Sequence, residues 1–394
     1  MRIVLNEPPP PVRPAVAIGA ALLILLPASV AIVALLVEGK SVPAGLIVPL
    51  ALFLFPVITG LRRLFRRGSR KKPTGELVIT DDTIAVSLPG TKPWQAPLLS
   101  LRVLRAAKVG LMVGNSDGAV VVPKASLTIA AADVVTAVHA ALAALPDGPS
   151  LAHFLTERDQ AAAALEKRPL VATYGVAAVI AVVFAIEWYA GALSQGRVLL
   201  ELGAARRDLV LAGGGPGLWR IPAAALMHGH VLHLVLNGTT LLVLGPILER
   251  WLGKWRFLLV LLGGALIGTG ASALLRADMA TVGLSGGLFA LLGALATATL
   301  RYRTAPLIGP RLPARAWVIL LVTNAAITLA PGVDAWAHVG GALAGALIAL
   351  PLTPSVKNGE RVPSLVKERG AMRAALVVIA IYVAGLGGMA LHAL

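Results

Sequence analysis

A succession of long apolar segments is the feature that most constrains how this chain folds. A helix needs about 17 to 25 apolar residues to cross a bilayer, and roughly nine runs are long enough to do so. Hydrophobic residues make up 57% of the chain and charged residues 14%, which excludes an ordinary soluble protein. We therefore predict a polytopic membrane protein. Its expected spans lie at 14–37, 43–61, 169–192, 229–248, 256–275, 282–300, 315–331, 336–352 and 373–393.

The formal charge of +16 is best explained by membrane orientation. Basic residues gather after the second, fourth, sixth and eighth expected spans, within 62–72, 250–256, 301–315 and 357–373. By the positive-inside rule these segments are cytosolic, which puts the N-terminus inside and the C-terminus outside. Because the charges follow span ends and do not form one folded face, a nucleic-acid partner is not indicated.

The first apolar run is expected to be a retained anchor. It is longer than the hydrophobic region of a signal peptide, which has about 7 to 15 residues, and Glu7 and a run of prolines precede it. The chain contains no cysteine, which excludes disulfides, thiolate catalysis and cysteine-ligated metal.

The chain divides into four parts on composition. Residues 1–72 are expected to form a transmembrane hairpin with a basic cytosolic end, and 73–165 a small cytosolic α+β domain. Residues 166–355 contain six of the spans, and 356–394 form a cytosolic linker and an extra transmembrane helix. The polar residues that would be costly in a membrane lie almost entirely in the last two parts, so function is expected there.

Short alternating stretches predict strands in the 73–165 section. The stretches 77–79 and 83–88 flank the turn signal at Asp81 and Asp82, and 111–113 and 119–122 flank a second turn. A helical pattern from Ala131 to Leu145 follows. This order of elements resembles the bacterial pleckstrin-homology-like domains found beside membrane hairpins, which leaves open a regulatory, lipid-contacting, oligomerising or spacer role.

Four polar side chains near the starts of three spans suggest acyl-transfer chemistry. His233 and Asn237 are four residues apart and share a helical face, Ser285 opens the sixth span, and His338 lies just inside the eighth. These spans run in the same direction, so the four residues can meet at one depth. A serine hydroxyl needs a base, for which His338 is the candidate. The helix-start amides, His233 and Asn237 are candidate donors to the oxyanion.

No carboxylate lies inside these three spans, so a buried aspartate that would complete a triad is absent from the sequence there. Asp334, four residues before His338, is expected to have a helix-start or interface role instead. Small residues would let the two helices that carry Ser285 and His338 approach closely. These residues are Gly286, Gly293, Gly341 and Gly345.

Two other polar groups receive structural interpretations. His228, His230 and His233 are clustered, but no cysteine or intramembrane acid completes a metal site, so none is expected. We expect His228 to fix an external loop and His230 to face water. Glu187, beside Trp188 and Tyr189, is expected to anchor a span at the membrane boundary.

These residues match the motifs of the rhomboid intramembrane proteases, which the sequence resembles over roughly residues 166–355. The GxSG motif of that family is Gly283-Leu284-Ser285-Gly286 here, and its Ala-His-x-x-Gly-x-x-x-Gly motif is residues 337–345. The stretch 227–237 resembles the family's second core helix. The resemblance implies a six-helix core in which Ser285 is the nucleophile, His338 the base, and His233 and Asn237 the oxyanion-hole residues.

Further positions of the family carry over with supporting roles. Trp219-Arg220 looks like the pair in the family's first external loop, and Gly245, Glu249 and Gly253 look like its Gly-x-x-x-Glu-x-x-x-Gly segment. Phe289 stands where many relatives have a tyrosine that stacks on the catalytic histidine, so the aromatic face is kept.

The expected function is therefore that of an intramembrane serine endopeptidase that needs no cofactor. Its partners would be the bilayer and transmembrane substrates with small residues and an easily unwound helix, and its location the bacterial inner membrane with a cytosolic N-terminus. An inactive rhomboid-like protein that escorts clients is one rival, which the retained Ser285 and His338 disfavour. A transporter is another, but the spans show no obvious internal repeat.

Overall fold

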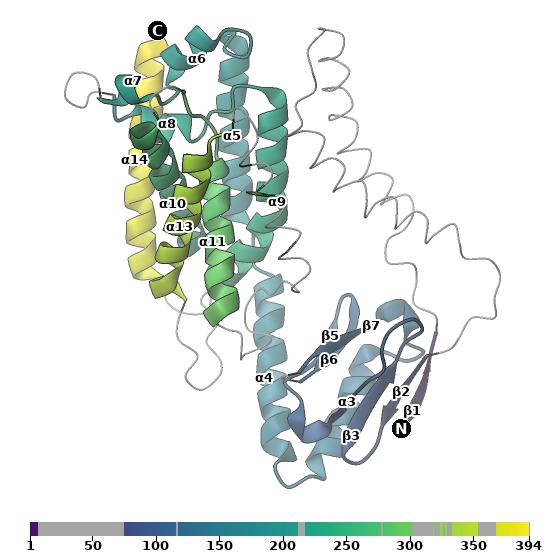
Figure 1. The fold of residues 1–394 in the computed structure, drawn as a ribbon. Coiled ribbons are helices and arrows are strands. Elements are labelled where there is room, and N and C mark those ends of the chain that lie inside the picture. The colour runs from purple at the N-terminus through teal and green to yellow at the C-terminus, as the bar shows by residue number, and fades with distance from the viewer. Residues whose placement is uncertain are drawn as a thin grey trace, which may run out of the picture. The chain divides into compact units, whose positions relative to one another are not determined.

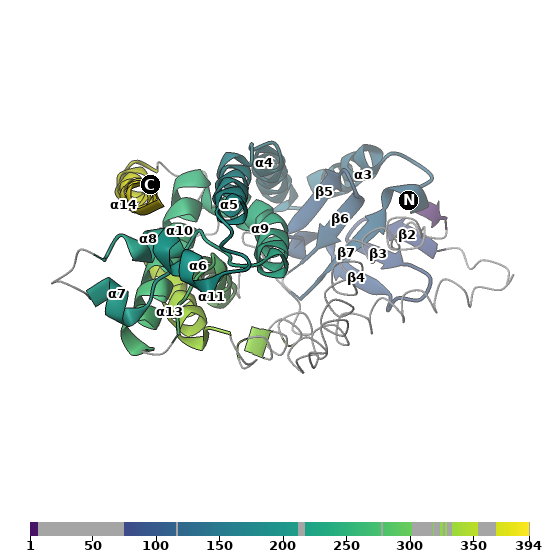
Figure 2. The same cartoon turned by 90° about the horizontal axis from the view of Figure 1, so that it is seen from above.

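The computed structural model describes residues 1–6, 75–115, 117–211, 217–276, 279–301, 318, 324–325, 328, 333–353 and 368–393. These residues form two compact units, one up to Lys167 and one from Arg168 onward (Figures 1 and 2). The expected spans at 14–37 and 43–61, the basic run 62–72, most of the span at 315–331 and the linker at 356–367 lie outside the described residues.

The first unit consists of two antiparallel sheets and two helices. One sheet has the order β1 (Arg2–Leu5), β2 (Gly75–Ile79), β3 (Thr83–Ser87) and β4 (Trp94–Pro97). The other is β5 (Val103–Ala107), β6 (Gly110–Gly114) and β7 (Ala119–Pro123), followed by α3 (Ala131–Ala143) and α4 (Gly148–Glu166). Alternate residues such as Leu77 and Ile84 point into one core with Val134 and Leu142 of α3, as the period-two pattern predicts.

The first six residues of the chain belong to this unit. Leu5 lies opposite Gly75 and Arg2 opposite Val78 in the ladder between β1 and β2. Ile3 and Leu5 are buried in the core of the unit. The expected boundary at residue 73 is therefore wrong at this point, because β1 had been assigned to the hairpin. A four-residue strand is too short to be recognised from periodicity alone.

The second unit is a bundle of helices, which Figure 2 shows end-on. Its long helices are α5 (Val171–Tyr189), α9 (Val231–Leu252), α10 (Lys254–Leu275), α11 (Ser285–Arg301), α13 (Ala335–Leu352) and α14 (Arg369–Ala393), and the short helices α6 (Gly196–Leu202), α7 (Arg207–Leu211) and α8 (Arg220–Ala224) lie between α5 and α9. Among the residues that the structure describes, five segments are long and apolar enough to cross a membrane, namely the stretch Gly148–Tyr189, α9, α10, α13 and α14. Most described residues are helical, and the chain is an integral membrane protein.

The bundle has chemically distinct ends. Basic residues lie where α9 ends, α10 begins and α11 ends, as Arg250, Lys254 and Arg301 illustrate. At the opposite end, where α5 finishes and α13 begins, Tyr189 is 95% exposed and Trp336 is also exposed. Tryptophan and tyrosine are enriched at membrane interfaces. The distribution agrees with alternating helix directions.

The C-terminal helix α14 contacts the rest of the bundle near its start, in its middle and near its end. Near its start Glu368 pairs with Arg256 of α10 at 3.3 Å. In its middle the Tyr382 hydroxyl donates to the Leu262 carbonyl at 3.1 Å. Near its end His392 stacks on Trp219, with ring centroids 4.7 Å apart. The extra helix is thus packed into the bundle.

Glycines bring α11 and α13 into backbone contact. A Cβ on Gly341 would overlap the Gly286 carbonyl, and one on Gly345 would overlap the Ala290 carbonyl. A Cβ on Gly293 would likewise overlap the Ala342 carbonyl. The predicted close approach of these helices is therefore present, and it leaves no room for a side chain.

We predict that Gly345→Ala destabilises the bundle by about 1 to 3 kcal/mol, because the added methyl group must push α13 away from α11. Equilibrium unfolding in mixed detergent micelles measures the change. Gly387→Ala in α14 is the matched control, since a Cβ there meets no atom within 4 Å. A Gly345→Ala variant as stable as the control would contradict the packing argument.

Candidate active site

Ser285 is the first residue of α11 and follows a tight turn. Gly283 has φ +118°, a value that favours glycine, and its N–H donates to the Ala224 carbonyl at 2.8 Å. Thr281 pairs with Ala205 in an isolated bridge just before this turn. The start of α11 is therefore held by the segment around α6 to α8. The Gly287 and Leu288 N–H groups donate to the Leu284 carbonyl at 2.9 and 3.1 Å, so the amides of Ser285 and Gly286 are the ones that the first turn leaves without an acceptor in the helix.

His338 is the fourth residue of α13, and the residue is 5% exposed. Phe289, one helical turn after Ser285, stacks on the imidazole with centroids 4.0 Å apart and planes inclined by 13°. The phenylalanine thus provides the aromatic face that the resemblance implied. Because Phe289 and Ser285 share one face of α11, this stack lies on the same side of α11 as the serine.

Asp334 begins α13. Its Oδ1 accepts from the Ala337 N–H at 3.1 Å, and its Oδ2 accepts from the Ser272 hydroxyl. The predicted helix-start role of Asp334 is confirmed, and both carboxylate oxygens are occupied by groups other than the His338 ring.

The starts of α11 and α13 lie together. A Cβ on Gly286 would be 3.3 Å from the Ala337 carbonyl, and a Cβ on Gly341 would overlap the Gly286 carbonyl. Ser285 and His338 are the immediate neighbours of Gly286 and Ala337 along the chain. The structure therefore brings the two helix starts that carry these residues into backbone contact.

His233 and Asn237 of α9 converge on Gly283. A Cβ on Gly283 would be 2.7 Å from His233 Nε2 and 3.4 Å from Asn237 Nδ2. Asn237 is 6% exposed, and its Nδ2 has no hydrogen-bond partner among the described residues. A buried amide without a partner is costly. It is therefore suited to receive a hydrogen-bond acceptor two residues from Ser285.

The partner of His233 determines what its ring offers. His233 Nδ1 lies 2.9 Å from the His228 carbonyl, and a carbonyl only accepts, so Nδ1 carries the hydrogen. In a neutral ring Nε2, which faces Gly283, then has a lone pair and no hydrogen. The sequence predicts that both His233 and Asn237 donate to the oxyanion. A neutral His233 has no hydrogen on Nε2, so Asn237 is then the side-chain donor.

Glu187 organises the loop before α9. It is fully buried, and its carboxylate accepts from the N–H groups of His228 at 2.9 Å and Gly229 at 3.0 Å. His228 also holds the loop through Nδ1, which lies 3.1 Å from the Leu226 carbonyl. The expectation of a boundary anchor for Glu187 is therefore wrong. An acid inside an apolar span was the signal that could have indicated a buried role.

His230 also has a specific contact. Its ring is at the N-cap of α9, where Nδ1 accepts from the His233 N–H at 3.1 Å. His230 is exposed, as expected, but it caps the helix and does not only face water. Within the described residues, no group of three or more histidine or acidic side chains is arranged to hold a metal ion.

We predict that Glu187→Leu destabilises the protein by about 2 to 4 kcal/mol, because two buried N–H groups lose their acceptor. Glu187→Gln keeps one acceptor oxygen and should lose less. Glu201→Gln, at an exposed ion pair with Arg197, is the control and should change stability by less than about 0.5 kcal/mol. Unfolding in mixed micelles ranks the variants, and equal stability of Glu187→Leu and the control would refute the role.

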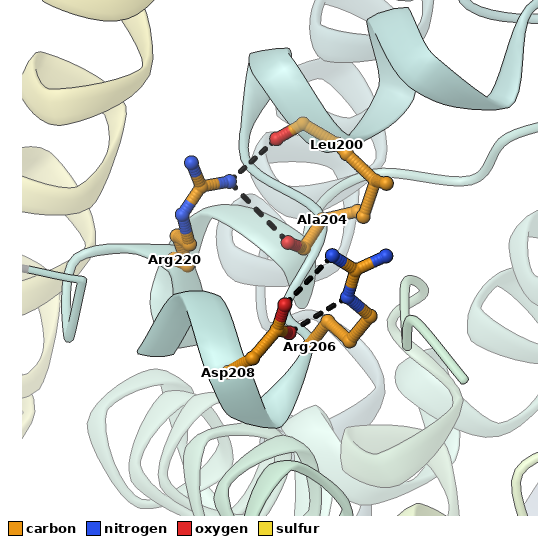
Figure 3. A network of polar contacts seen from close by, with 5 residues as sticks. All are labelled: Leu200, Ala204, Arg206, Asp208 and Arg220. Atoms are coloured by element: carbon orange, nitrogen blue, oxygen red, sulfur yellow. Dashed lines mark hydrogen bonds and ion pairs between the residues drawn. The ribbon is translucent and has the colours of Figure 1, made fainter. Parts of the chain in front are cut away.

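Two arginines make polar contacts within the segment between α5 and α9 (Figure 3). Arg220 Nη1 donates to the Leu200 carbonyl and lies 3.5 Å from that of Ala204. The same guanidinium lies 4.8 Å above the Trp219 ring. Nearby, Arg206 binds Asp208 through two contacts of 2.7 Å and holds the pKa of that carboxyl below its usual range. These contacts fit a structural role for Trp219 and Arg220.

Glu249 caps the start of α5 at the basic end of the bundle. Its buried carboxylate accepts from the N–H groups of Ala172 at 2.8 Å and Thr173 at 2.7 Å. A Cβ on Gly245 would be 2.7 Å from the Thr173 side chain, and Gly253, with φ +86°, leaves room for Glu368. Glu249 therefore caps α5, and the two glycines of this motif make room for neighbouring side chains.

Residues 216–355 match the family model of the rhomboid domain. RHOMBOID-like protein 6, mitochondrial, from Arabidopsis thaliana is 32% identical over 142 residues, 36% of this chain and 46% of that protein. Rhomboid protease GluP from Bacillus subtilis is 29% identical over 181 residues, 45% of this chain and 34% of that protein. Putative rhomboid protease YdcA, from the same bacterium, is 41% identical over 76 residues, 19% and 38% respectively.

The chain spans less than half the length of each of these relatives. Fold and site define a helical integral membrane protein in which helix starts gather a serine, a stacked histidine and a buried amide. The match identifies residues 216–355 of the chain as a rhomboid domain.

Proposed function

We propose that this chain is an intramembrane serine endopeptidase that cuts transmembrane segments of other membrane proteins with Ser285 and His338. The observation that carries the proposal is the backbone contact between the starts of α11 and α13, with His338 stacked on Phe289 of the serine's own helix. The match to the rhomboid domain supports intramembrane proteolysis in general. In this proposal the hairpin is formed by residues 1–72, except that β1 joins the cytosolic domain of residues 73–165. The protease core is formed by residues 166–355, and the linker with the extra helix by residues 356–394.

The mechanism follows from the groups at the site. Ser285 Oγ attacks the carbonyl carbon of the scissile peptide while His338 takes the hydroxyl proton. The oxyanion is stabilised by the amides at the start of α11 and by Asn237 Nδ2. His338 then gives the proton to the leaving amine, which breaks the peptide bond. Water, activated by His338, hydrolyses the acyl-enzyme and releases the new carboxylate.

The six-helix core of the proposal consists of α5, α9, α10, α11, the expected span at 315–331 and α13, with α14 as the seventh helix. Ser285, His338 and His233 lie at helix starts, opposite the end that carries Arg250, Lys254 and Arg301. By the positive-inside rule the site then faces the outer side, in a bacterial inner membrane. A client segment has to unwind there, because a helical peptide bond is shielded by its own hydrogen bonds.

A rhomboid-like protein that binds clients without cutting them is the second candidate. Both Ser285 and His338 are retained, and Asn237 presents an amide hydrogen that packing does not use. A binding protein has no need of such a donor beside a serine. These features favour the enzyme.

The first prediction from this proposal concerns the dyad. Wild-type protein in proteoliposomes should cleave a single-span substrate with small, helix-breaking residues near its outer end, whereas Ser285→Ala and His338→Ala should each lose at least about 10³-fold in rate. A fluorophosphonate should label wild type and not Ser285→Ala. Ser194→Ala, in an exposed loop, is the control and should behave as wild type. Wild type that neither cleaves nor is labelled would favour the binding protein.

A second prediction separates the two oxyanion candidates. Asn237→Ala should lower kcat by about 10²- to 10³-fold, the cost of removing one oxyanion donor. His233→Ala should lower kcat less at about pH 8, where a histidine with an ordinary pKa is neutral. The two kcat values are compared for variants with wild-type unfolding curves. An equal or larger loss for His233→Ala would mean that His233 donates at this pH.

A further inference from the structure

Thr328 contacts one of the two ring nitrogens of His338. Its Oγ1 lies 2.9 Å from His338 Nδ1, well within hydrogen-bond distance. The threonine precedes His338 by ten residues and falls within the segment expected as the span at 315–331. No motif in the sequence sets it apart.

We propose that Thr328 is a positioning residue for the base, in that its hydroxyl oxygen accepts the hydrogen of His338 Nδ1. The proposal rests on the proposed function. A neutral imidazole carries one hydrogen, so placing it on Nδ1 leaves the Nε2 lone pair free to take the proton of Ser285. The opposite tautomer would present an N–H to the serine and could not act as a base.

Two contacts then fix the His338 ring, namely the stack on Phe289 and the hydrogen bond to Thr328. Stacking on Phe289 fixes the plane of the imidazole. It still permits a half-turn about the Cβ–Cγ bond, which returns the ring to the same plane with its two edges exchanged. A hydrogen bond to Nδ1 removes this freedom, because a flip would exchange Nδ1 for a carbon that bonds no acceptor strongly. The hydrogen-bond contact of Nδ1 is with Thr328, whereas the oxygens of Asp334 accept from Ala337 and Ser272.

A hydroxyl differs from the carboxylate of a serine-protease triad in two ways. It is neutral, so it orients the ring but does not compensate the charge of the imidazolium. It also has a hydrogen of its own, which a threonine in a helix can donate to the carbonyl four residues earlier, and this leaves its lone pairs for the imidazole. We therefore expect a rate contribution of about tenfold, far below the roughly 10⁴-fold cost of disabling the aspartate of a triad.

The test compares variants at this position in the full-length chain. Thr328→Val keeps the shape and removes the hydroxyl, and it should lower kcat about tenfold with KM within about twofold. Thr328→Ser restores the hydroxyl and should recover kcat to within about threefold of wild type. Thr297→Val is the matched control, since Thr297 bonds a backbone carbonyl of the same helix α13, that of Ala346 at 3.3 Å, and should leave kcat unchanged.

The rate of Ser285 labelling by a fluorophosphonate is the second readout. Labelling needs the base but no transmembrane substrate, so it should fall in Thr328→Val by the same factor as kcat. If the valine variant does not fold, Thr328→Cys replaces it, because a thiol is a weak acceptor.

Three outcomes would overturn the inference. Wild-type kcat and labelling in Thr328→Val would show that the hydroxyl is dispensable, while the dyad and the proposed function stand. A loss that Thr328→Ser does not restore, or one carried by KM, would make Thr328 a packing residue. Wild type that neither cleaves nor is labelled would overturn the proposed function, and this inference with it.

Discussion

The backbone contact between α11 and α13 is the interaction on which the rest of the second unit depends. In lipid the hydrophobic effect does not press helices together, so they associate where small residues let many atoms touch. Gly286, Gly341 and Gly345 permit this, and no side chain separates the two helix starts. The contact also sets the reach of the catalytic groups, because a stack such as that between Phe289 and His338 requires helices this close.

Buried polar groups in the bundle serve mainly to hold backbone in place. Glu249 and Asp334 satisfy helix starts, Glu187 satisfies the loop before α9, and Arg220 satisfies two carbonyls near α6. A backbone group without a partner is costly at this depth, so each of these side chains removes a cost that the fold would otherwise carry. Asn237 Nδ2 has no hydrogen-bond partner among the described residues, so it is suited to bind an acceptor from a ligand.

Features that rest on local pattern could be predicted from the sequence. The apolar lengths predict α9, α10, α11, α13 and α14, and spacing on a helix predicts that His233 and Asn237 share a face. Features that depend on contacts between distant residues could not be predicted in this way. The pairing of β1 with β2, the burial of Glu187 against the loop before α9, the hydrogen on His233 Nδ1 and the approach of Thr328 to His338 each need a partner that only the folded chain supplies.

The pairing of β1 with β2 has a consequence for how the chain enters the membrane. Strands can form one sheet only if both are in the same compartment, and β1 is synthesised about seventy residues before its partner. Leu5 and Gly75 must therefore lie on the same side of the membrane. A chain whose first residues were exported would leave the edge of β2 unpaired and the core without Ile3 and Leu5, so the sheet is completed only after correct insertion. The pairing of β1 with β2 thus forms only when the N-terminus and the first unit are on the same side of the membrane.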